Sequence, residues 1–143
     1  MISRKAVTWK GKSGVTILEV LIVLSIIALI AAVAGPRLVG YLGRAKSDTA
    51  ALQIGQIESA VQLFYIDVGR YPSDNEGLQV LLQAPAGTSD WDGPYLRKPE
   101  ALIDPWGRGY VYDGNGEGTD FTIRTFGRDG QQGGTGEDAD LSS

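Results

Sequence analysis

Residues 14–36 read GVTILEVLIVLSIIALIAAVAGP, and this stretch decides how the rest of the chain is organised. In the 21 residues 15–35, the only polar side chains are those of Thr16, Glu19 and Ser25. A helix of this length is about 31 Å long, close to the hydrocarbon thickness of a bilayer. The sequence therefore predicts a membrane-spanning helix over residues 15–35.

Charge is distributed unevenly around this helix. Residues 1–14 carry four basic and no acidic side chains, whereas the remaining chain carries nine basic and 17 acidic ones. A basic stretch before a first membrane helix favours a cytoplasmic N-terminus, so we expect the acidic remainder on the far side of the membrane. An acidic body disfavours nucleic acid as a partner and is compatible with binding a cation.

The composition excludes several classes of protein. The 143 residues contain neither Cys nor His, which excludes a disulfide scaffold, a zinc site built from these residues, a thiol nucleophile and a Ser–His–Asp triad. Glycines at 113–118 lack the strand–loop–helix context of a phosphate-binding loop. Asp104 with Asp129 or Glu117 could form a carboxylate pair, but no pattern makes them converge, so we expect no enzyme.

Two alternatives compete with an assembly role for the apolar segment. A cleavable secretory signal has a shorter apolar core followed by small residues at the cut site, whereas Gly35-Pro36-Arg37 and more helical pattern follow here. The second alternative is a plain membrane anchor. A carboxylate in the bilayer costs about 2.5–3.5 kcal/mol, and a plain anchor accounts for Glu19 only by its position near a helix end, from which its side chain could reach the interface.

Glu19 lies five residues after Gly14, where the basic leader meets the apolar run. Cleavage between Gly14 and Val15 would create a positive α-amino group, with which Glu19 of a neighbouring helix could pair. A buried charge with a fixed partner sets the register between subunits. We therefore assign Gly14 and Val15 to processing, and Glu19, Thr16 and Pro36 to assembly.

Gly14 and the following VTILEVLIVL resemble the N-terminal segment of type IV pilin-like proteins. The resemblance implies that a prepilin peptidase cuts after Gly14 on the cytoplasmic side and methylates the amino group of Val15. The family usually has Phe where this chain has Val15, a difference that bears on methylation more than on cleavage.

Residues 36–69 predict an amphipathic second half of the same helix. Apolar residues recur at three- and four-residue steps, and the helix should end near 67–69 with Gly69 as its cap. Pro36 and the neighbouring glycines weaken the middle of the helix, as a linker or as a segment that melts when subunits pack into a fibre. The predicted apolar positions are Leu38, Tyr41, Leu42, Ala45, Leu52, Ile57, Val61, Phe64, Tyr65 and Val68.

Residues 70–143 predict a globular region of loops, one short helix and a short sheet. The helix is expected at 77–83. Residues 110–112 and 121–125 alternate apolar and polar side chains, as half-buried antiparallel strands do, and a hairpin loop joins them. Together with the long helix, these elements predict an α+β fold.

The chain also resembles the major pseudopilins of type II secretion systems, from Gly14 to Leu141. The resemblance implies a type IV pilin-like fold: one long helix packed on a small domain with a short antiparallel sheet and a calcium-binding loop. It implies a structural subunit that polymerises into the periplasmic pseudopilus and drives export of folded proteins across the outer membrane. The motifs in order are GRYP (69–72), EGL (76–78), WDGPYL (91–96), DPWG (104–107), YVY (110–112) and FGRDGQQGG (126–134).

The same resemblance implies partners and a location. The partners are further copies of the chain in a helical filament, minor pseudopilins, prepilin peptidase, an inner-membrane assembly platform with a cytoplasmic ATPase, and an outer-membrane secretin, with no nucleic acid. The chain would cross the bacterial inner membrane once, with its N-terminus cytoplasmic and its C-terminal domain periplasmic.

The alternatives to this function are a type IV pilin, a minor pseudopilin of a related filament, and a membrane-anchored calcium-binding module. Many type IV pilins carry a C-terminal disulfide loop, which this chain cannot form because it contains no Cys. A membrane-anchored calcium-binding module would have no need for Gly14 before the apolar run or for Glu19 within it.

The last loop is rich in glycine and gathers four acids within 12 residues. A hard cation with oxygen ligands would relieve their repulsion; from composition alone, a solvated acidic tail is equally compatible, and the spacing does not fit an EF-hand. The resemblance implies one structural Ca²⁺ here, and leaves open whether Glu137 or Asp138 binds it. The implied ligands are Asp129, Asp140, Asp138 and the carbonyls of Phe126 and Gln131.

Overall fold

The structure is a computed structural model that describes residues 14–114 and 120–143. Two compact units divide the chain, one ending at Val39 and the other comprising Gly40–Ser143. The leader up to residue 13, Glu117 and most of the predicted hairpin loop lie outside the described residues.

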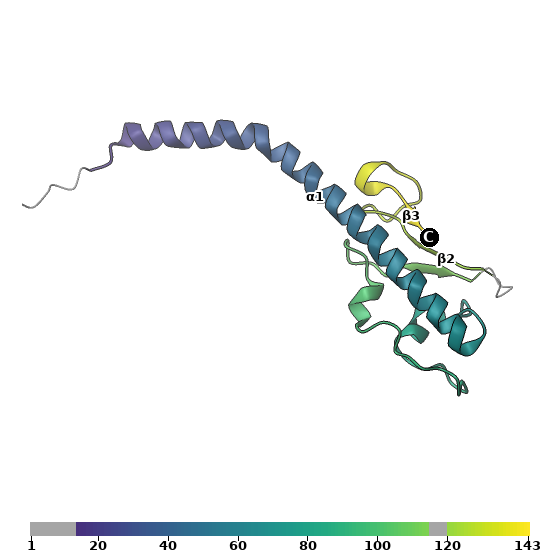
Figure 1. Cartoon of the computed structure of the whole chain (residues 1–143). Helices are drawn as coiled ribbons and strands as arrows, with labels where there is room; N and C mark the ends of the chain where they lie inside the picture. The colour runs from purple at the N-terminus through teal and green to yellow at the C-terminus, as the bar shows by residue number, and fades with distance from the viewer. Residues whose placement is uncertain (1–13, 115–119) are drawn as a thin grey trace, which may run out of the picture. The chain divides into compact units, whose positions relative to one another are not determined.

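Helix α1 runs from Ile17 to Val68, with Pro36 inside it (Figure 1). It begins after Thr16, whose Oγ1 accepts a hydrogen bond from the backbone N–H of Glu19 at 3.2 Å. A threonine that caps a helix in this way, followed three residues later by Glu, is a favourable helix start. The local sequence at the start of the apolar run therefore specifies where the helix begins.

The first part of α1 carries an apolar surface that no other part of the described chain covers. One stretch of α1 is long and apolar enough to cross a membrane by length and composition, and none of that stretch is buried. Ile17, Leu29 and Val33 are among its exposed side chains. A surface this apolar requires lipid or neighbouring subunits around it.

The second half of α1 supplies one wall of the hydrophobic core of the Gly40–Ser143 unit. Of the predicted apolar positions, Ile57, Val61 and Phe64 are buried, whereas six are exposed: Leu38, Tyr41, Leu42, Ala45, Leu52 and Tyr65. Leu52 has no apolar neighbour on its own face, where Gly55, Gln56 and Ser59 follow it. The buried face also contains residues that were not predicted: Ala50, Ile54 and Ala60.

Helix α1 ends as the sequence predicted. Gly69 follows the last helical residue with a φ of 77°, and its N–H donates to the carbonyl of Tyr65 at 2.8 Å. This left-handed conformation is accessible to glycine at little cost. The chain then turns back along the helix.

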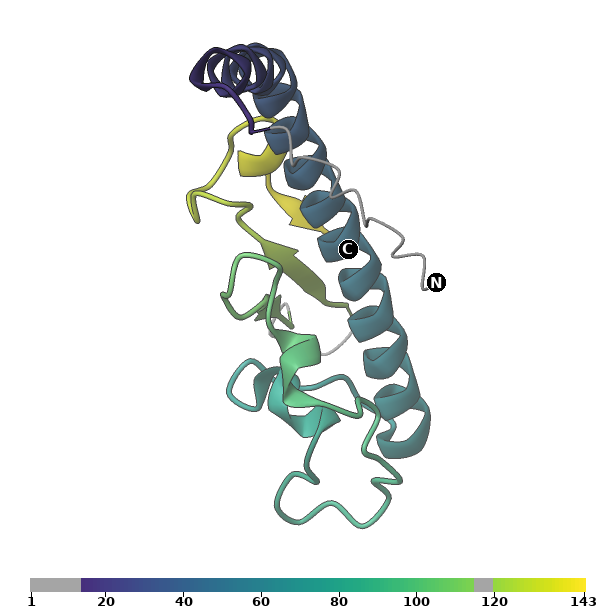
Figure 2. The same ribbon diagram turned by 90° about the vertical axis from the view of Figure 1, so that its left-hand side faces the viewer.

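The rest of the unit consists of short elements beside α1 (Figure 2). The predicted strands are present within one residue of their expected bounds, and they pair antiparallel with Tyr112 opposite Ile123. A third strand, not predicted, pairs with the second, with Thr125 opposite Leu141. The elements are the 3-10 helices η1 (Gly77–Leu81), η2 (Pro99–Leu102) and η3 (Gly136–Asp138), and strands β1 (Val111–Asp113), β2 (Thr122–Thr125) and β3 (Leu141–Ser142), in sheet order β1-β2-β3.

The core joins α1 to these short elements. One buried cluster contains Phe64 of α1, Leu81 of η1, Ile123 of β2, and Tyr110, which directly precedes β1. The Tyr110 hydroxyl donates to Oε1 of Gln53 on α1 at 2.9 Å. Burial raises the pKa of the Tyr110 phenol above its ordinary value.

Candidate functional site

The predicted processing site lies directly before α1. Gly14 and Val15 are exposed and precede the first helical residue, so the peptide bond between them is outside the helix. A side chain at Gly14 would meet no atom of the described residues within 4 Å. Packing within residues 14–114 and 120–143 therefore gives no reason for glycine at this position.

Glu19 lies in the first turn of α1 and is exposed. A negative charge there interacts favourably with the helix dipole. Within residues 14–114 and 120–143, Glu19 forms no ion pair. The part of the chain that the structure describes thus leaves this carboxylate without a cationic partner.

The weak middle of α1 is helical in this chain. The helix is continuous through Pro36. A side chain at Gly35 or Gly40 would meet no atom within 4 Å, but one at Gly43 would lie 2.7 Å from Oε2 of Glu137. Gly43, expected only to weaken the helix, therefore also admits the C-terminal loop to the helix surface.

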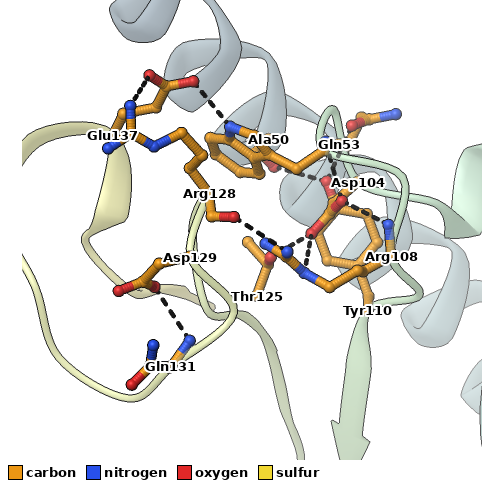
Figure 3. A network of polar contacts seen from close by, with 11 residues as sticks. Ala50, Gln53, Asp104, Arg108, Tyr110, Thr125, Arg128, Asp129, Gln131 and Glu137 are labelled. Carbon is orange, nitrogen blue, oxygen red and sulfur yellow. Dashed lines mark hydrogen bonds and ion pairs between the residues drawn. The ribbon is translucent and has the colours of Figure 1, made fainter.

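Two of the predicted calcium ligands close turns within the acidic loop. Oδ1 of Asp129 accepts the N–H of Gln131 at 3.0 Å, as Figure 3 shows, and Oδ2 of Asp140 accepts the N–H of Gly133 at 2.9 Å. Both acids are exposed. The carbonyl of Phe126, a third predicted ligand, accepts the N–H of Gly130 at 3.1 Å.

The structure gives Asp138 a different partner from the one predicted. Nε and Nη2 of Arg128 donate to the two carboxylate oxygens of Asp138, each at 2.9 Å. Arg128 Nη1 also lies 3.4 Å from Oε2 of Glu137. In the described ranges, no three acidic side chains gather closely enough to hold a metal ion by themselves.

The loop closes tightly around the carbonyl of Asp138. A side chain at Gly127 would lie 2.8 Å from that oxygen, and one at Gly134 would come closer still. Both glycines have a positive φ, 60° and 87°, which favours glycine independently of crowding. The combination of exposed carboxylates and a glycine-rich backbone offers oxygen atoms, the donor type that Ca²⁺ prefers.

A buried acid lies beneath the loop. The carboxylate of Asp104 is fully buried. Its Oδ1 accepts the N–H groups of Trp106 and Arg108 at 3.0 and 2.8 Å, and its Oδ2 accepts the hydroxyl of Thr125 at 2.5 Å (Figure 3). A buried carboxylate requires this degree of hydrogen bonding. Both carboxylate oxygens of Asp104 are thus used in hydrogen bonds that support the turn and β2, while Asp129 binds an N–H group of its own loop.

Arg108 connects this buried acid to the loop. Its Nη1 donates to the carbonyl of Arg128 at 3.0 Å, and its Nε lies 3.9 Å from Oδ2 of Asp104. The sequence analysis did not predict the connection of Asp104 and Arg108 to the loop. A signal was available only for Asp104, which begins a turn that contains Pro and Gly, a position where Asp often accepts the backbone N–H groups of the residues that follow.

Comparison with known families gives two matches that together cover most of the chain. The family model described as "Type II secretion system (T2SS), protein G" matches residues 37–143. The model described as "Prokaryotic N-terminal methylation motif" matches residues 9–35. The boundary between the two matches lies at the Gly35–Pro36 interruption of the apolar run.

Similar proteins agree with these matches. Type II secretion system core protein G of Xanthomonas campestris pv. campestris is 36% identical to this chain, over 92% of this chain and 89% of the relative. The protein of the same name from Pseudomonas aeruginosa is 34% identical, over 94% of this chain and 96% of the relative. The crystal structure of the major pseudopilin from the type 2 secretion system of enterohaemorrhagic Escherichia coli is 26% identical, with a TM-score of 0.57 over 73% of this chain and 87% of that chain.

Proposed function

The chain belongs to the type II secretion system protein G family, and from this membership we infer that it is a structural subunit of the pseudopilus, the filament of this secretion system. The observation that carries this function is the combination of the family match with an α1 segment of membrane-spanning length whose whole surface is exposed. Such a segment is anchored in the inner membrane before assembly and packed against neighbouring copies afterwards. Polymerisation then drives folded proteins across the outer membrane.

Processing by a prepilin peptidase precedes assembly in this proposal. The peptidase cuts between Gly14 and Val15 and methylates the new amino group. Three observations support this step: the methylation motif matches residues 9–35, the Gly14–Val15 bond lies outside α1, and packing among the described residues gives no reason for glycine at position 14.

The new amino group then pairs with Glu19 of a neighbouring subunit. Glu19 supports this assignment because it is exposed and forms no ion pair within the described residues. Thr16 caps α1 and so fixes the turn from which Glu19 projects. Pro36 removes one backbone donor from α1, and we propose that the helix opens there when subunits pack.

We further propose one structural Ca²⁺ in the acidic loop. Asp129 and Asp140 would bind it, with the carbonyls of Phe126 and Gln131, since a carbonyl oxygen that accepts one hydrogen bond retains a second lone pair. Asp138 would contribute its carboxylate only after leaving Arg128. The ion would supply positive charge to the loop and order it, as metals do in small structural sites.

The location and partners follow from the family. We propose that the N-terminus is cytoplasmic, because residues 1–14 are basic, and that the second unit is periplasmic. A separate cytoplasmic ATPase on an inner-membrane platform supplies the energy, minor pseudopilins join the filament, and an outer-membrane secretin provides the exit. The family supplies structural subunits, so we propose no catalytic activity. The family model and the relatives are named protein G and the similar solved structure is a major pseudopilin, which favours this role over a type IV pilin or a minor pseudopilin.

A test of this function combines the mass of the mature chain with its assembly state. The chain is expressed together with a prepilin peptidase and an assembly platform, and we expect a protein that starts at Val15, carries one added methyl group and forms crosslinked ladders. Gly14→Val should abolish cleavage and ladders, whereas the matched leader variant Gly11→Val should not. A purified chain that still begins at Met1 and stays monomeric would contradict the proposal.

A further inference from the structure

A closed ring of polar contacts connects the turn at residues 104–108 to the acidic loop (Figure 3). Asp104 accepts backbone N–H groups from Trp106 and Arg108. The Arg108 side chain donates to the carbonyl of Arg128, and the Arg128 side chain contacts Glu137. Glu137 in turn accepts the indole N–H of Trp106 at 3.0 Å. The ring therefore returns to the turn where it started.

We propose that Arg128 is an internal cation that holds Glu137 and Asp138 in place without a metal ion. Its guanidinium forms a two-point ion pair with Asp138, with both N–O distances at 2.9 Å. Its backbone N–H donates to the carbonyl of Glu137 at 2.8 Å. Main chain and side chain of one residue thus bind the same short segment, and we call Arg128, Glu137 and Asp138 the arginine arm of the loop.

The side chain of Arg128 is 56% exposed and that of Asp138 30%, so what distinguishes this contact from an ordinary surface ion pair is the second acid, Glu137. Exposed ion pairs contribute little, because water screens them and both side chains lose freedom. Here the side chain of Glu137 is only 19% exposed, since it packs against Gly43 of α1 and the indole of Trp106. A carboxylate partly removed from water needs a cationic or hydrogen-bonding partner, and Arg128 supplies the cation.

The remainder of the loop depends on different groups. Asp129 and Asp140 bind the N–H groups of Gln131 and Gly133, and we call these four residues the metal arm. Its assignment to Ca²⁺ rests on the function proposed above, whereas the arginine arm does not. The inference is therefore that two cations order one loop, and that removal of either should loosen only its own arm.

Hydrogen exchange of the full chain in detergent micelles tests this division, with fragmentation that resolves single amides. In wild type, EGTA should leave the amide of Arg128 protected, while the amides of Gln131 and Gly133 exchange at least tenfold faster than with Ca²⁺. Arg128→Gln should accelerate exchange at position 128 at least tenfold with or without Ca²⁺. Arg97→Gln is the matched control, because Arg97 forms no ion pair within the described parts of the chain.

Further variants keep the test decisive if Arg128→Gln fails to fold. Asp138→Asn should also loosen the amide of Arg128, and the charge-exchanged pair Arg128→Asp with Asp138→Arg should restore protection. Unchanged exchange at position 128 in both single variants would overturn the inference, as would loss of the wild-type Arg128 protection in EGTA. If Ca²⁺ changes neither arm, the calcium proposal fails and the division between two cations fails with it, while the role of Arg128 stands.

Discussion

Single residues in this chain carry roles that their own subunit does not complete, and Glu19 is the clearest. Its backbone N–H completes the cap of α1 with Thr16, but its carboxylate is exposed in a segment that is otherwise almost wholly apolar. A charge in such a place is costly unless it finds a partner. The partner that we propose, the amino group of Val15 in a neighbouring subunit, exists only after cleavage.

Glu19→Ala should therefore leave membrane insertion unchanged and impair filament assembly, because the apolar segment remains while the partner of the new amine is lost. Filament yield and crosslinking measure assembly, and membrane fractionation measures insertion. Ser25→Ala is the matched control: Ser25 lies in the same segment and its hydroxyl bonds only to the carbonyl of Leu21 within the described chain. Normal fibres from the Glu19 variant would remove the register argument.

At the scale of elements, the C-terminal loop depends on glycine for two separable reasons. Gly127 and Gly136 have similar positive φ values, 60° and 65°. A side chain at Gly127 would collide with the backbone of Asp138, whereas one at Gly136 would meet no atom within 4 Å. The two positions thus separate backbone strain from crowding.

Gly136→Ala should cost about 1–2 kcal/mol of unfolding free energy through the left-handed conformation alone. Gly127→Ala should cost more, because the neighbouring backbone must also move. Urea denaturation of both variants, followed by tryptophan fluorescence, measures the difference. Equal losses in the two variants would show that the loop can shift freely around Gly127.

The turn that follows α1 contains a second sensitive element. Arg70 donates to both carboxylate oxygens of Glu76 at 2.7 and 2.8 Å, and Ser73 donates its N–H and hydroxyl to the same carboxylate. These contacts, with the hydrogen bond from Arg70 as the largest, lower the pKa of Glu76 to about 2. The clamp ties the end of α1 to η1.

Because the pKa of Glu76 is lower in the folded than in the unfolded chain, the clamp stabilises the fold above the unfolded pKa of about 4.5. This contribution should disappear as the pH falls from about 4.5 towards about 2. The melting temperature of Glu76→Gln should thus lie below that of wild type at pH 6 and approach it at pH 2.5. Glu100→Gln, at an exposed glutamate, is the control, and a gap that does not change with pH would contradict the mechanism.

For the whole molecule, the two units have opposite relations to water. The unit ending at Val39 exposes an apolar helix surface, while the unit Gly40–Ser143 buries its own core. The first therefore needs a bilayer or neighbouring copies, and the second can present a polar surface to water. Head-to-tail contacts between identical subunits that do not close into a ring produce an open helical filament.

Calcium should stabilise the full chain in detergent if the acidic loop binds it. We expect EGTA to lower the melting temperature by a few degrees, since binding to the folded state alone stabilises it. Asp129→Ala should abolish this calcium-dependent shift, whereas Asp48→Ala, the same change at an exposed acid of α1, should retain it. No shift with Ca²⁺ and no bound metal by native mass spectrometry would reject the site.

The sequence by itself determined the features that depend on near neighbours along the chain. The apolar run, the end of α1 at Gly69, the two longer strands and the family resemblance all follow from local pattern, and the structure and comparisons confirm them. β3 escaped prediction because two residues are too few to show a period. The sequence also showed that four acids lie between positions 129 and 140, but it did not show which group binds each of them.

Only the tertiary structure decided which of the apolar residues of α1 pack, and which charges meet. The hydrogen bond between Trp106 and Glu137 joins residues 31 positions apart, and that between Asp104 and Thr125 joins residues 21 apart. Such pairings depend on how the chain folds back upon α1, and side-chain periodicity carries no information about them. For this reason the sequence did not show that Asp104 is a buried support of the turn, or that Asp138, a predicted calcium ligand, lies against Arg128.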